Sequence, residues 1–296
     1  MAGNTEKFAF CNEWIRRFEQ VCKQADVREG AQYRCGVDLG TSCIVVAVID
    51  EDDRPVAGRV QLAEAVRDGM VVDYWGAVQI VRKMREELEG ELGPLLYAAA
   101  AIPPGTVALD GGAVRNVVES AGFELTALLE ESGAANALLQ IENGAIVDIG
   151  GGTTGISVFE AGKEVYAADE ATGGKHFTLT LAGAMGIPFE DAERCKRDPA
   201  RHREILPILR PVVEKVASII QSHVAGKGVE ELYLVGGSSC LTGIEGIIEA
   251  RTGLPTYKPQ NPLFVTPLGI ALNCGLKNGG GHYGDLHHQI PLGGNH

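Results

Sequence analysis

One pattern occurs twice in this chain of 296 residues. An apolar run leads into an aspartate, an aliphatic residue, glycine and a hydroxyl residue, and a second, alternating apolar run follows. The first copy reads Gly36-Val37-Asp38-Leu39-Gly40-Thr41-Ser42, and the second reads Ile146-Val147-Asp148-Ile149-Gly150-Gly151-Gly152-Thr153-Thr154. Each copy predicts a strand, a tight turn and a second strand. Together with the helical patterns between them, the two hairpins predict an α/β protein of two similar lobes.

The turns of both hairpins suit an anion. Glycine tolerates positive φ and lets backbone N–H groups come close to a phosphate. We therefore expect phosphate contacts from Gly40, Thr41 and Ser42 in the first turn and from Gly150, Gly151, Gly152 and Thr153 in the second. Asp38 and Asp148 end buried strands, so they are candidates to hold magnesium, through water because that ion gives up its waters reluctantly.

The second hairpin also fits a different motif, the dinucleotide-binding fingerprint. Gly150, Gly152 and Gly155 match G-x-G-x-x-G, and Asp169 and Glu170 follow at about the 20-residue distance of a ribose-binding acid. That fingerprint needs a helix directly after the glycines. Here residues 155–159 alternate as a strand does, and another strand-like run follows at 164–167. The phosphate-binding hairpin is therefore the better interpretation.

A third glycine motif, Gly236-Gly237-Ser238, follows a third buried strand at residues 232–235. With the two hairpins it resembles the phosphate-1, phosphate-2 and adenosine motifs of the actin, hexokinase and heat-shock ATPase superfamily. The resemblance implies a two-lobed actin-like ATPase fold with duplicated ribonuclease-H-like lobes. It also implies that the ligand is ATP or ADP with magnesium.

Longer stretches are similar to one family within it, the EutJ family of heat-shock-ATPase-like proteins of ethanolamine utilisation. These stretches are residues 36–41, 67–71, 103–106, 148–156, 168–176 and 179–183, and residues 66–74 also resemble bacterial shape-determining actins. The resemblance implies that Glu193, Lys196 and Arg197, on one face of a helix, hold ribose and adenine. It implies that adenine lies against Gly236, Gly237 and Ser238.

Two departures from the heat-shock ATPases concern catalysis. Their lobe junction carries Glu-Pro-Thr, and this chain reads Glu131-Ser132-Gly133. The resemblance makes Glu131 the candidate for positioning the attacking water, with Glu130 as the alternative. Gly155 stands where those chaperones have another aspartate, and no counterpart of their catalytic lysine can be named. The sequence therefore supports ATP binding better than fast hydrolysis.

The predicted organisation has four parts. Residues 1–33 form an amphipathic helix, expected over 6–26, and a linker; the helix packs on its own lobe or docks on a partner. Residues 34–145 form the first lobe, to which a helix at about 265–275 returns, and residues 146–264 form the second lobe. The tail, 276–296, is rich in glycine and holds four of the seven histidines, which favours disorder over a metal site.

Composition excludes some classes of protein. A net charge of −13 argues against binding to nucleic acid or to an anionic membrane, where basic patches supply the affinity. There is no signal peptide and no run of 18 apolar residues, so we expect a cytoplasmic protein with no membrane partner. Seven cysteines without a C-x-x-C pair predict buried free thiols.

These features predict an ATP-binding, chaperone-like protein of an ethanolamine-type bacterial microcompartment pathway, with slow ATP turnover. Few residues follow Gly275, so we expect no heat-shock peptide-binding domain. Nucleotide would close the lobes and change the surface shown to a partner, either ethanolamine ammonia-lyase or a shell protein. The alternatives are a filament-forming actin-like protein and a small-molecule kinase on the same fold, which would need a catalytic aspartate.

Overall fold

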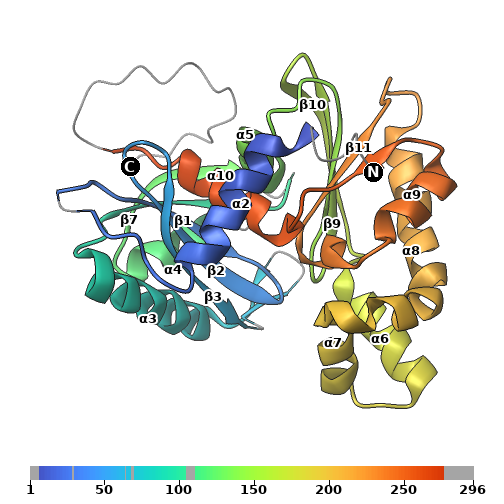
Figure 1. The fold of residues 1–296 in the computed structure, drawn as a ribbon, viewed down its shortest axis with the longest axis horizontal. Helices are drawn as coiled ribbons and strands as arrows, with labels where there is room; N and C mark the ends of the chain where they lie inside the picture. Colours follow the sequence, from blue (N-terminus) through green and yellow to red (C-terminus); the bar gives the residue numbers. More distant parts are fainter. Residues whose placement is uncertain (1–6, 29, 64, 68–69, 105–110, 277–296) are drawn as a thin grey trace. The chain divides into compact units, whose positions relative to one another are not determined.

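A computed structural model describes residues 7–28, 30–63, 65–67, 70–104 and 111–276 of the chain. These residues form two compact lobes (Figure 1). Of the described residues, the first lobe contains those from 7 to 140 and those from 264 onward, and the second lobe runs from Ile141 to Leu263. The chain therefore leaves the first lobe, builds the second from one continuous segment, and returns.

The first lobe is built on a five-stranded mixed sheet with the order β3-β2-β1-β6-β7. Strands β1, β2 and β3 are antiparallel neighbours, and β1, β6 and β7 are parallel neighbours. The strands are β1 (Arg34–Leu39), β2 (Cys43–Ile49), β3 (Pro55–Leu62), β6 (Tyr97–Ile102) and β7 (Glu124–Glu130). Both faces of β6 are buried, which explains its almost unbroken run of alanines.

Helices cover both faces of this sheet. Alternate residues of β6 face α3 (Tyr74–Leu92) and α4 (Gly111–Ser120) on one side and α5 (Glu131–Leu139) and α10 (Val265–Leu272) on the other. Helix α3 begins where the Asp73 carboxylate accepts a hydrogen bond from the Gly76 N–H.

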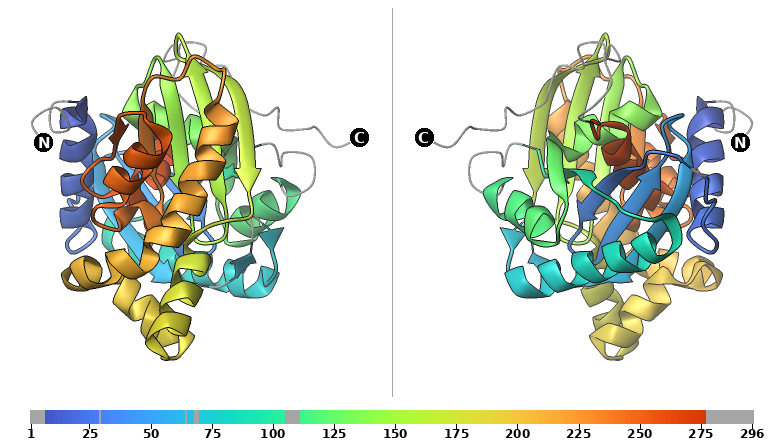
Figure 2. Two further views of the ribbon diagram at one scale, coloured as in Figure 1. Left: turned by 90° about the vertical axis from the view of Figure 1, so that its right-hand side faces the viewer. Right: turned by 90° about the vertical axis from the view of Figure 1, so that its left-hand side faces the viewer.

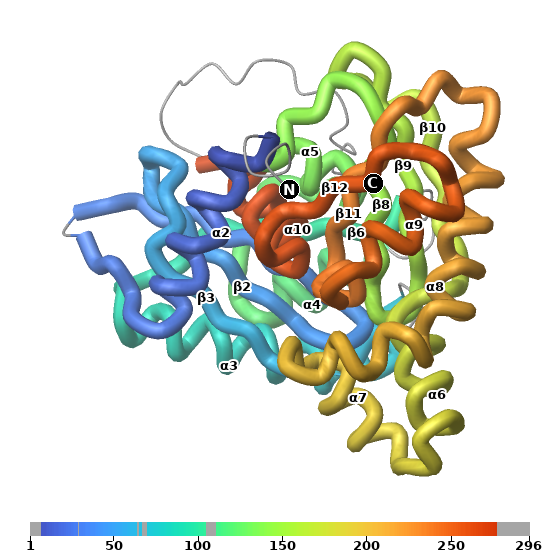
Figure 3. Tube along the Cα trace, turned by 45° about the vertical axis from the view of Figure 1, so that its right-hand side comes forward, coloured from blue at the N-terminus to red at the C-terminus, as the bar shows by residue number. Residues whose placement is uncertain are grey.

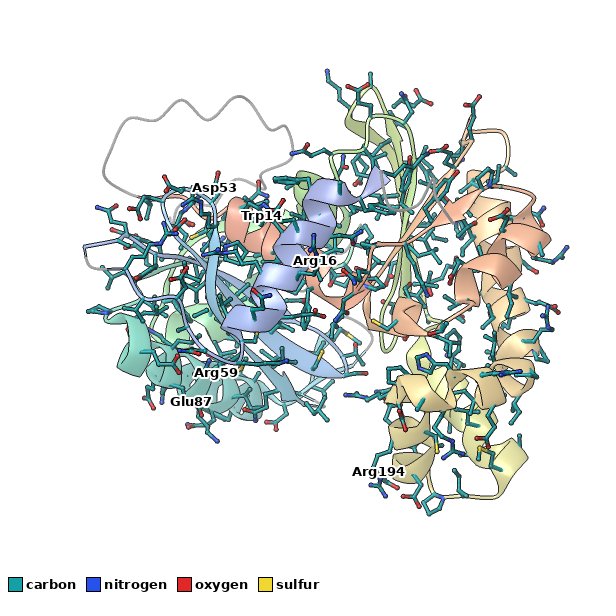
Figure 4. All side chains as sticks on the ribbon, viewed as in Figure 1. Trp14, Arg16, Asp53, Arg59, Glu87 and Arg194 are labelled. Carbon is teal, nitrogen blue, oxygen red and sulfur yellow. The ribbon has the colours of Figure 1, made fainter. Side chains whose placement is uncertain are left out.

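The N-terminal helix and a short hairpin complete the first lobe. Helix α2 (Ala9–Val21) packs on edge strand β3 through its buried face, which includes Ile15 and Phe18. The hairpin consists of β4 (Val66–Arg67) and β5 (Met70–Val71). An ion pair also joins β3 to α3: the side chains of Arg59 on β3 and Glu87 on α3 point toward one another (Figure 4).

A buried arginine ties the returning C-terminal segment to the first strand. The Arg34 guanidinium donates to the carbonyl oxygens of Cys274 (3.4 Å) and Asp50 (3.2 Å) and forms an ion pair with Asp53. Arg34 is 2% exposed, so these partners replace the water that its charge has lost.

The second lobe repeats the same sheet. Its strand order is β10-β9-β8-β11-β12, again with one antiparallel and one parallel half around the first strand of the hairpin. The strands are β8 (Gly144–Ile149), β9 (Thr154–Glu160), β10 (Lys163–Glu170), β11 (Leu232–Val235) and β12 (Thr256–Tyr257). This duplication confirms the prediction of an α/β protein with two similar lobes.

Four helices of the second lobe pack around its apolar core. They are α6 (Gly174–Met185), α7 (Phe189–Arg197), α8 (His202–Val224) and α9 (Ile244–Thr252). Helices α8 and α9 lie side by side on one face of the sheet (Figure 2), and α6 and α7 form a pair that extends beyond the ends of the strands (Figure 3).

Several sequence predictions fall wholly or partly on residues outside the described ranges. They are the tail from residue 277 onward and the stretches at 68–69 and 105–106 that carry part of the family resemblance. Within the described ranges, no helix is both long and apolar enough to cross a membrane.

Candidate functional site

In the first lobe, the predicted residues lie at one end of β1 and at the start of α5. Asp38 is paired with Val45 across the hairpin, and the turn contains Gly40, Thr41 and Ser42. A Cβ on Gly40 would lie 2.8 Å from the Cys43 carbonyl oxygen, so this tight turn requires glycine.

The two candidate glutamates lie next to each other at the start of one helix. Glu131 is the first residue of α5, and Glu130 is the N-cap residue before it. Both belong to the first lobe and both are half-buried.

In the second lobe, the corresponding turn joins β8 to β9. The Gly150 N–H donates to the Thr153 carbonyl oxygen at 3.0 Å, which closes the turn. Asp148 lies one residue before the end of β8 and is paired with Gly155 of β9.

The segment between β10 and α6 crosses this turn, and the first residues of α6 are hydrogen-bonded to it. The N–H groups of Gly174 and Lys175 donate to the carbonyl oxygens of Gly150 (2.9 Å) and Gly151 (2.8 Å). In a trans peptide the C=O and the following N–H point in opposite directions. Holding these two carbonyls therefore aims the N–H groups of Gly151 and Gly152 away from α6, as an anion-binding turn requires.

Glycine is also required at the crossing point itself. A Cβ on Gly173 would lie 2.7 Å from the Gly152 carbonyl carbon and 2.8 Å from the Thr153 nitrogen. Both contacts are shorter than side-chain carbons tolerate, and both are with backbone. No residue with a side chain fits at this crossing without moving the turn between β8 and β9.

The third glycine motif also meets this turn. The Ser238 hydroxyl donates to the Gly150 carbonyl oxygen at 2.7 Å. Gly236 has a φ of 86°, and a Cβ there would collide with the Asp148 carboxylate and lie 2.7 Å from the Ile149 carbonyl oxygen. The glycine pair thus lies directly against the end of β8.

Helix α7 brings three of the predicted adenosine-binding residues together. The Lys196 ammonium lies 2.7 Å from the Glu193 carboxylate, and the Arg197 guanidinium lies 2.6 Å from the other carboxylate oxygen. Burial opposes ionisation of Glu193, but the charge and hydrogen bonds of its partners outweigh it, so its pKa is lowered. Burial lowers the pKa of Lys196, and Glu193 offsets that effect only in part.

The structure thus gathers the predicted residues in two groups. Within the second lobe, the start of α6 connects the turn after β8 to helix α7, and the glycine pair is bonded to the same turn. This group contains Asp148, Gly150, Gly151, Gly152, Thr153, Glu193, Lys196, Arg197, Gly236, Gly237 and Ser238. The other group, in the first lobe, contains Asp38, Gly40, Thr41, Ser42 and Glu131.

Sequence reasoning missed two residues that hold this arrangement. The buried Thr178 hydroxyl lies between Lys196, Glu193 and the Gly174 carbonyl oxygen. The buried His202 ring accepts a hydrogen bond from the Thr242 N–H at Nδ1 and donates from Nε2 to the Lys196 carbonyl oxygen. The helical spacing of Gly174 and Thr178 is the only signal for the first, and no signal in the sequence marks the second.

The strand register also places a second acid near Asp148. Gly155 of β9 is paired with Asp148 on one side and with Asp169 of β10 on the other. Directly paired residues share a face of the sheet. Asp169 therefore lies on the same face as Asp148, with the side-chain-free Gly155 between them.

Asp38, Asp148 and Asp169 are better suited to hold a metal ion through its bound water molecules than to coordinate it directly. Among the described residues, no group of three or more His, Cys, Asp or Glu side chains could hold a metal. Magnesium would have to take its remaining ligands from phosphate oxygens and water, which is its usual behaviour with nucleotides.

Comparison with known protein sequences gives matches of two kinds. The family model of the type IV pilus assembly protein PilM matches residues 114–262. The ethanolamine utilization protein EutJ of Salmonella typhimurium is 44% identical over 271 residues, which cover 91% of this chain and 95% of that protein.

Solved structures agree with these matches. The crystal structure of EutJ from Carboxydothermus hydrogenoformans superposes with a TM-score of 0.82 at 44% identity, over 91% of this chain and 98% of the other. MreB 5 of Spiroplasma citri bound to AMPPNP superposes with a TM-score of 0.64 at 16% identity, over 81% and 95%, and so shares the fold. The predicted actin-like fold is confirmed, and the chain belongs to the EutJ family.

Proposed function

We propose that this protein binds ATP or ADP with magnesium. The observation that carries the proposal is the convergence on one backbone carbonyl, that of Gly150. It accepts hydrogen bonds from Ser238 of the glycine-pair segment and from Gly174, whose own carbonyl accepts from Lys196 of α7. The three parts expected to hold phosphate, adenine and ribose are therefore bonded to one another within one lobe.

Each group of residues has a separate role in this proposal. The turn glycines and Thr153, with Gly40, Thr41 and Ser42 of the first lobe, bind the phosphates through N–H and O–H donors. Asp38 and Asp148 hold magnesium through its waters. Glu193 and Arg197 bind the nucleoside beside Gly236, Gly237 and Ser238. A nucleotide-bound member of the fold, the MreB 5 structure with AMPPNP, supports the ligand class.

Hydrolysis should be slow. Gly155 supplies no carboxylate, and Glu131 is the one residue we assign to positioning the attacking water. Losing one positioned electrostatic group commonly costs about 10²–10³ in rate. We therefore infer a nucleotide-gated, chaperone-like switch, in which nucleotide changes the surface shown to a partner protein.

The partner follows from the family. Its members are named for ethanolamine utilisation, so the candidates are ethanolamine ammonia-lyase and a shell protein of the bacterial microcompartment. Co-purification with each candidate in ATP and in ADP tests this step. Binding that does not depend on the nucleotide would contradict a switch.

Calorimetry and thermal melting test the nucleotide proposal. Mg-ATP at 100 times its dissociation constant should stabilise the fold by about 2.7 kcal/mol. Asp148→Ala should weaken the magnesium-dependent part of ATP binding, whereas Glu131→Ala should keep binding and lower turnover, because it would act on the water. Glu130→Ala tests the alternative candidate: lowered turnover in this variant and not in Glu131→Ala would assign the role to Glu130. If no purine nucleotide at millimolar concentration raised the melting temperature, the proposal would be refuted.

The same preparations discriminate the alternatives. Sedimentation that depends on ATP would favour a filament. Rapid turnover with a small alcohol or sugar, yielding a phosphorylated product, would favour a kinase.

A further inference from the structure

We propose that Lys196 positions the phosphate-binding turn and does not contact the nucleoside, with Thr178 as its buried partner. The proposal deepens the function proposed above and rests on it only where nucleotide affinity is measured. It assigns Lys196 a different role from Glu193 and Arg197, its neighbours on α7.

All hydrogen atoms of the Lys196 ammonium have acceptors inside the protein. An ammonium group has three donors and no acceptor. The Nζ atom lies 2.7 Å from Glu193 Oε2, 2.9 Å from Thr178 Oγ1 and 3.1 Å from the Gly174 carbonyl oxygen. Its side chain is 11% exposed. To bind a ribose hydroxyl, Lys196 would first have to give up one of these three acceptors.

Thr178 cannot itself touch a ligand, because it is 0% exposed. Its hydroxyl accepts from Lys196 and has one hydrogen to donate, for which Glu193 and the Gly174 carbonyl oxygen are within reach. The hydroxyl thus keeps the carboxylate and the ammonium in place beside α6. Any effect of Thr178 on ligand binding must act through the residues that it contacts.

Gly174 transmits the position of Lys196 to the turn. Its carbonyl oxygen accepts from Lys196, and its N–H donates to the Gly150 carbonyl oxygen at 2.9 Å. A Cβ on Gly174 would lie 3.1 Å from Lys196 Nζ and 3.4 Å from the Gly150 oxygen, so the ammonium and the turn are separated only by this residue. Moving Lys196 therefore moves the donor that fixes Gly150.

The other cations of α7 differ from Lys196. Arg197 pairs with Glu193 Oε1 and is 36% exposed, so it can present its guanidinium to a base. Arg194 is 75% exposed, pairs with Asp191 and lies at the outer side of the helix (Figure 4). Burial and the bonds to α6 distinguish Lys196 from both.

The test uses two variants and two matched controls in the full-length chain. Lys196→Met removes the charge and keeps the length, and Thr178→Val removes only the hydroxyl. The controls are Arg194→Met and Thr180→Val. Thr180 makes the same kind of bond within α6, to the His176 carbonyl oxygen at 2.8 Å, but has no lysine partner.

Amide hydrogen exchange without ligand is the first measurement. Segments 149–154 and 173–177 should exchange several-fold faster in both variants, and at the wild-type rate in both controls, because the bonds of Gly150, Gly174 and Lys175 loosen. Strand 97–102 of the first lobe should be unchanged. Wild-type exchange at 149–154 in Thr178→Val and Lys196→Met would overturn the proposal.

Binding of Mg-ATP and Mg-tripolyphosphate is the second measurement. Both ligands should lose affinity by a similar factor, about fivefold for Thr178→Val and about tenfold or more for Lys196→Met. Loss of ATP affinity with tripolyphosphate unaffected would identify Lys196 as a nucleoside contact and overturn the proposal. If the wild-type protein binds neither ligand, the proposed function fails, and the exchange experiment still decides the role of Lys196.

Discussion

At the scale of single residues, the candidate site depends on glycines at which a Cβ atom would collide with neighbouring atoms. Gly236 and Gly93 share almost the same backbone conformation, with φ of 86° and 85° and nearly extended ψ of 161° and −170°. Of the two, Gly236 is enclosed by the Asp148 carboxylate and the Ile149 carbonyl oxygen, whereas a Cβ on Gly93 would meet nothing within 4 Å. Comparing the two separates the cost of backbone conformation from the cost of crowding.

We expect Gly93→Ala to lower the free energy of unfolding by about 1–3 kcal/mol, the cost of this glycine-only backbone conformation for a residue with a side chain. Gly236→Ala should lose about 1–3 kcal/mol more, because backbone atoms must move. Urea denaturation of both variants measures the difference. Equal losses would mean that the end of β8 yields to the added carbon.

The ion pairs of Glu193 with Lys196 and Arg197 predict that the stability of the fold depends on pH. Folding lowers the pKa of the Glu193 carboxyl from its ordinary value of 4.5. Its stabilising contribution is therefore complete above pH 4.5 and is lost as the pH falls through the lower pKa of the folded protein. The urea midpoint of the wild type should therefore fall more between neutral pH and about pH 4 than that of Glu193→Gln. Glu190→Gln, on the exposed side of α7, is the control and should follow the wild type.

At the scale of elements, the two helices on one face of the first sheet pack unusually closely. A Cβ on Gly269 of α10 would collide with the Ala134 carbonyl oxygen of α5 and lie 3.4 Å from the Ala135 nitrogen. Small residues on both helices, Ala134 and Gly269 among them, let the backbones touch. This contact attaches the returning C-terminal segment to the first lobe.

Gly269→Ala should therefore destabilise the protein by about 1–3 kcal/mol, because one helix must shift. Gly90→Ala is the matched control, since Gly90 lies in helix α3 with nothing within 4 Å of an added Cβ. There the same substitution should stabilise by about 0.4–1 kcal/mol, because it restricts the unfolded chain. Thermal melting shows whether each substitution raises or lowers the melting temperature. An unchanged melting temperature in Gly269→Ala would contradict the close packing of α5 and α10.

At the scale of the whole molecule, the seven cysteines differ in how well the fold protects their thiols. All are free thiols. Burial raises the pKa of Cys11 and of Cys22 to about 12, and it raises the pKa of Cys35 and of Cys274 as well. The thiolate is the reactive form, so these four should be nearly inert in the folded protein.

We expect iodoacetamide at about pH 8 to modify the half-buried Cys43, Cys195 and Cys240 first, and the other four only on unfolding. Peptide mapping by mass spectrometry over time measures each site. Early modification of Cys35 or Cys274 would show that the core of the first lobe opens more readily than its packing indicates. The same experiment in urea follows the unfolding of the first lobe, which contains all four protected thiols.

The sequence by itself determined the elements and the two hairpins. The strand predicted at residues 232–235 occurs as Leu232–Val235, and the one predicted at 155–159 lies within Thr154–Glu160, because apolar runs and the glycines beside them are local signals. It also determined the family, through long stretches of matching motif. Only the tertiary structure decided which partners those motifs have. The Gly150 carbonyl meets Ser238, 88 residues away, and Lys196 meets Thr178 and Gly174 on another helix. These contacts depend on sheet register and helix packing, which join residues far apart in the chain and leave no periodic pattern in it.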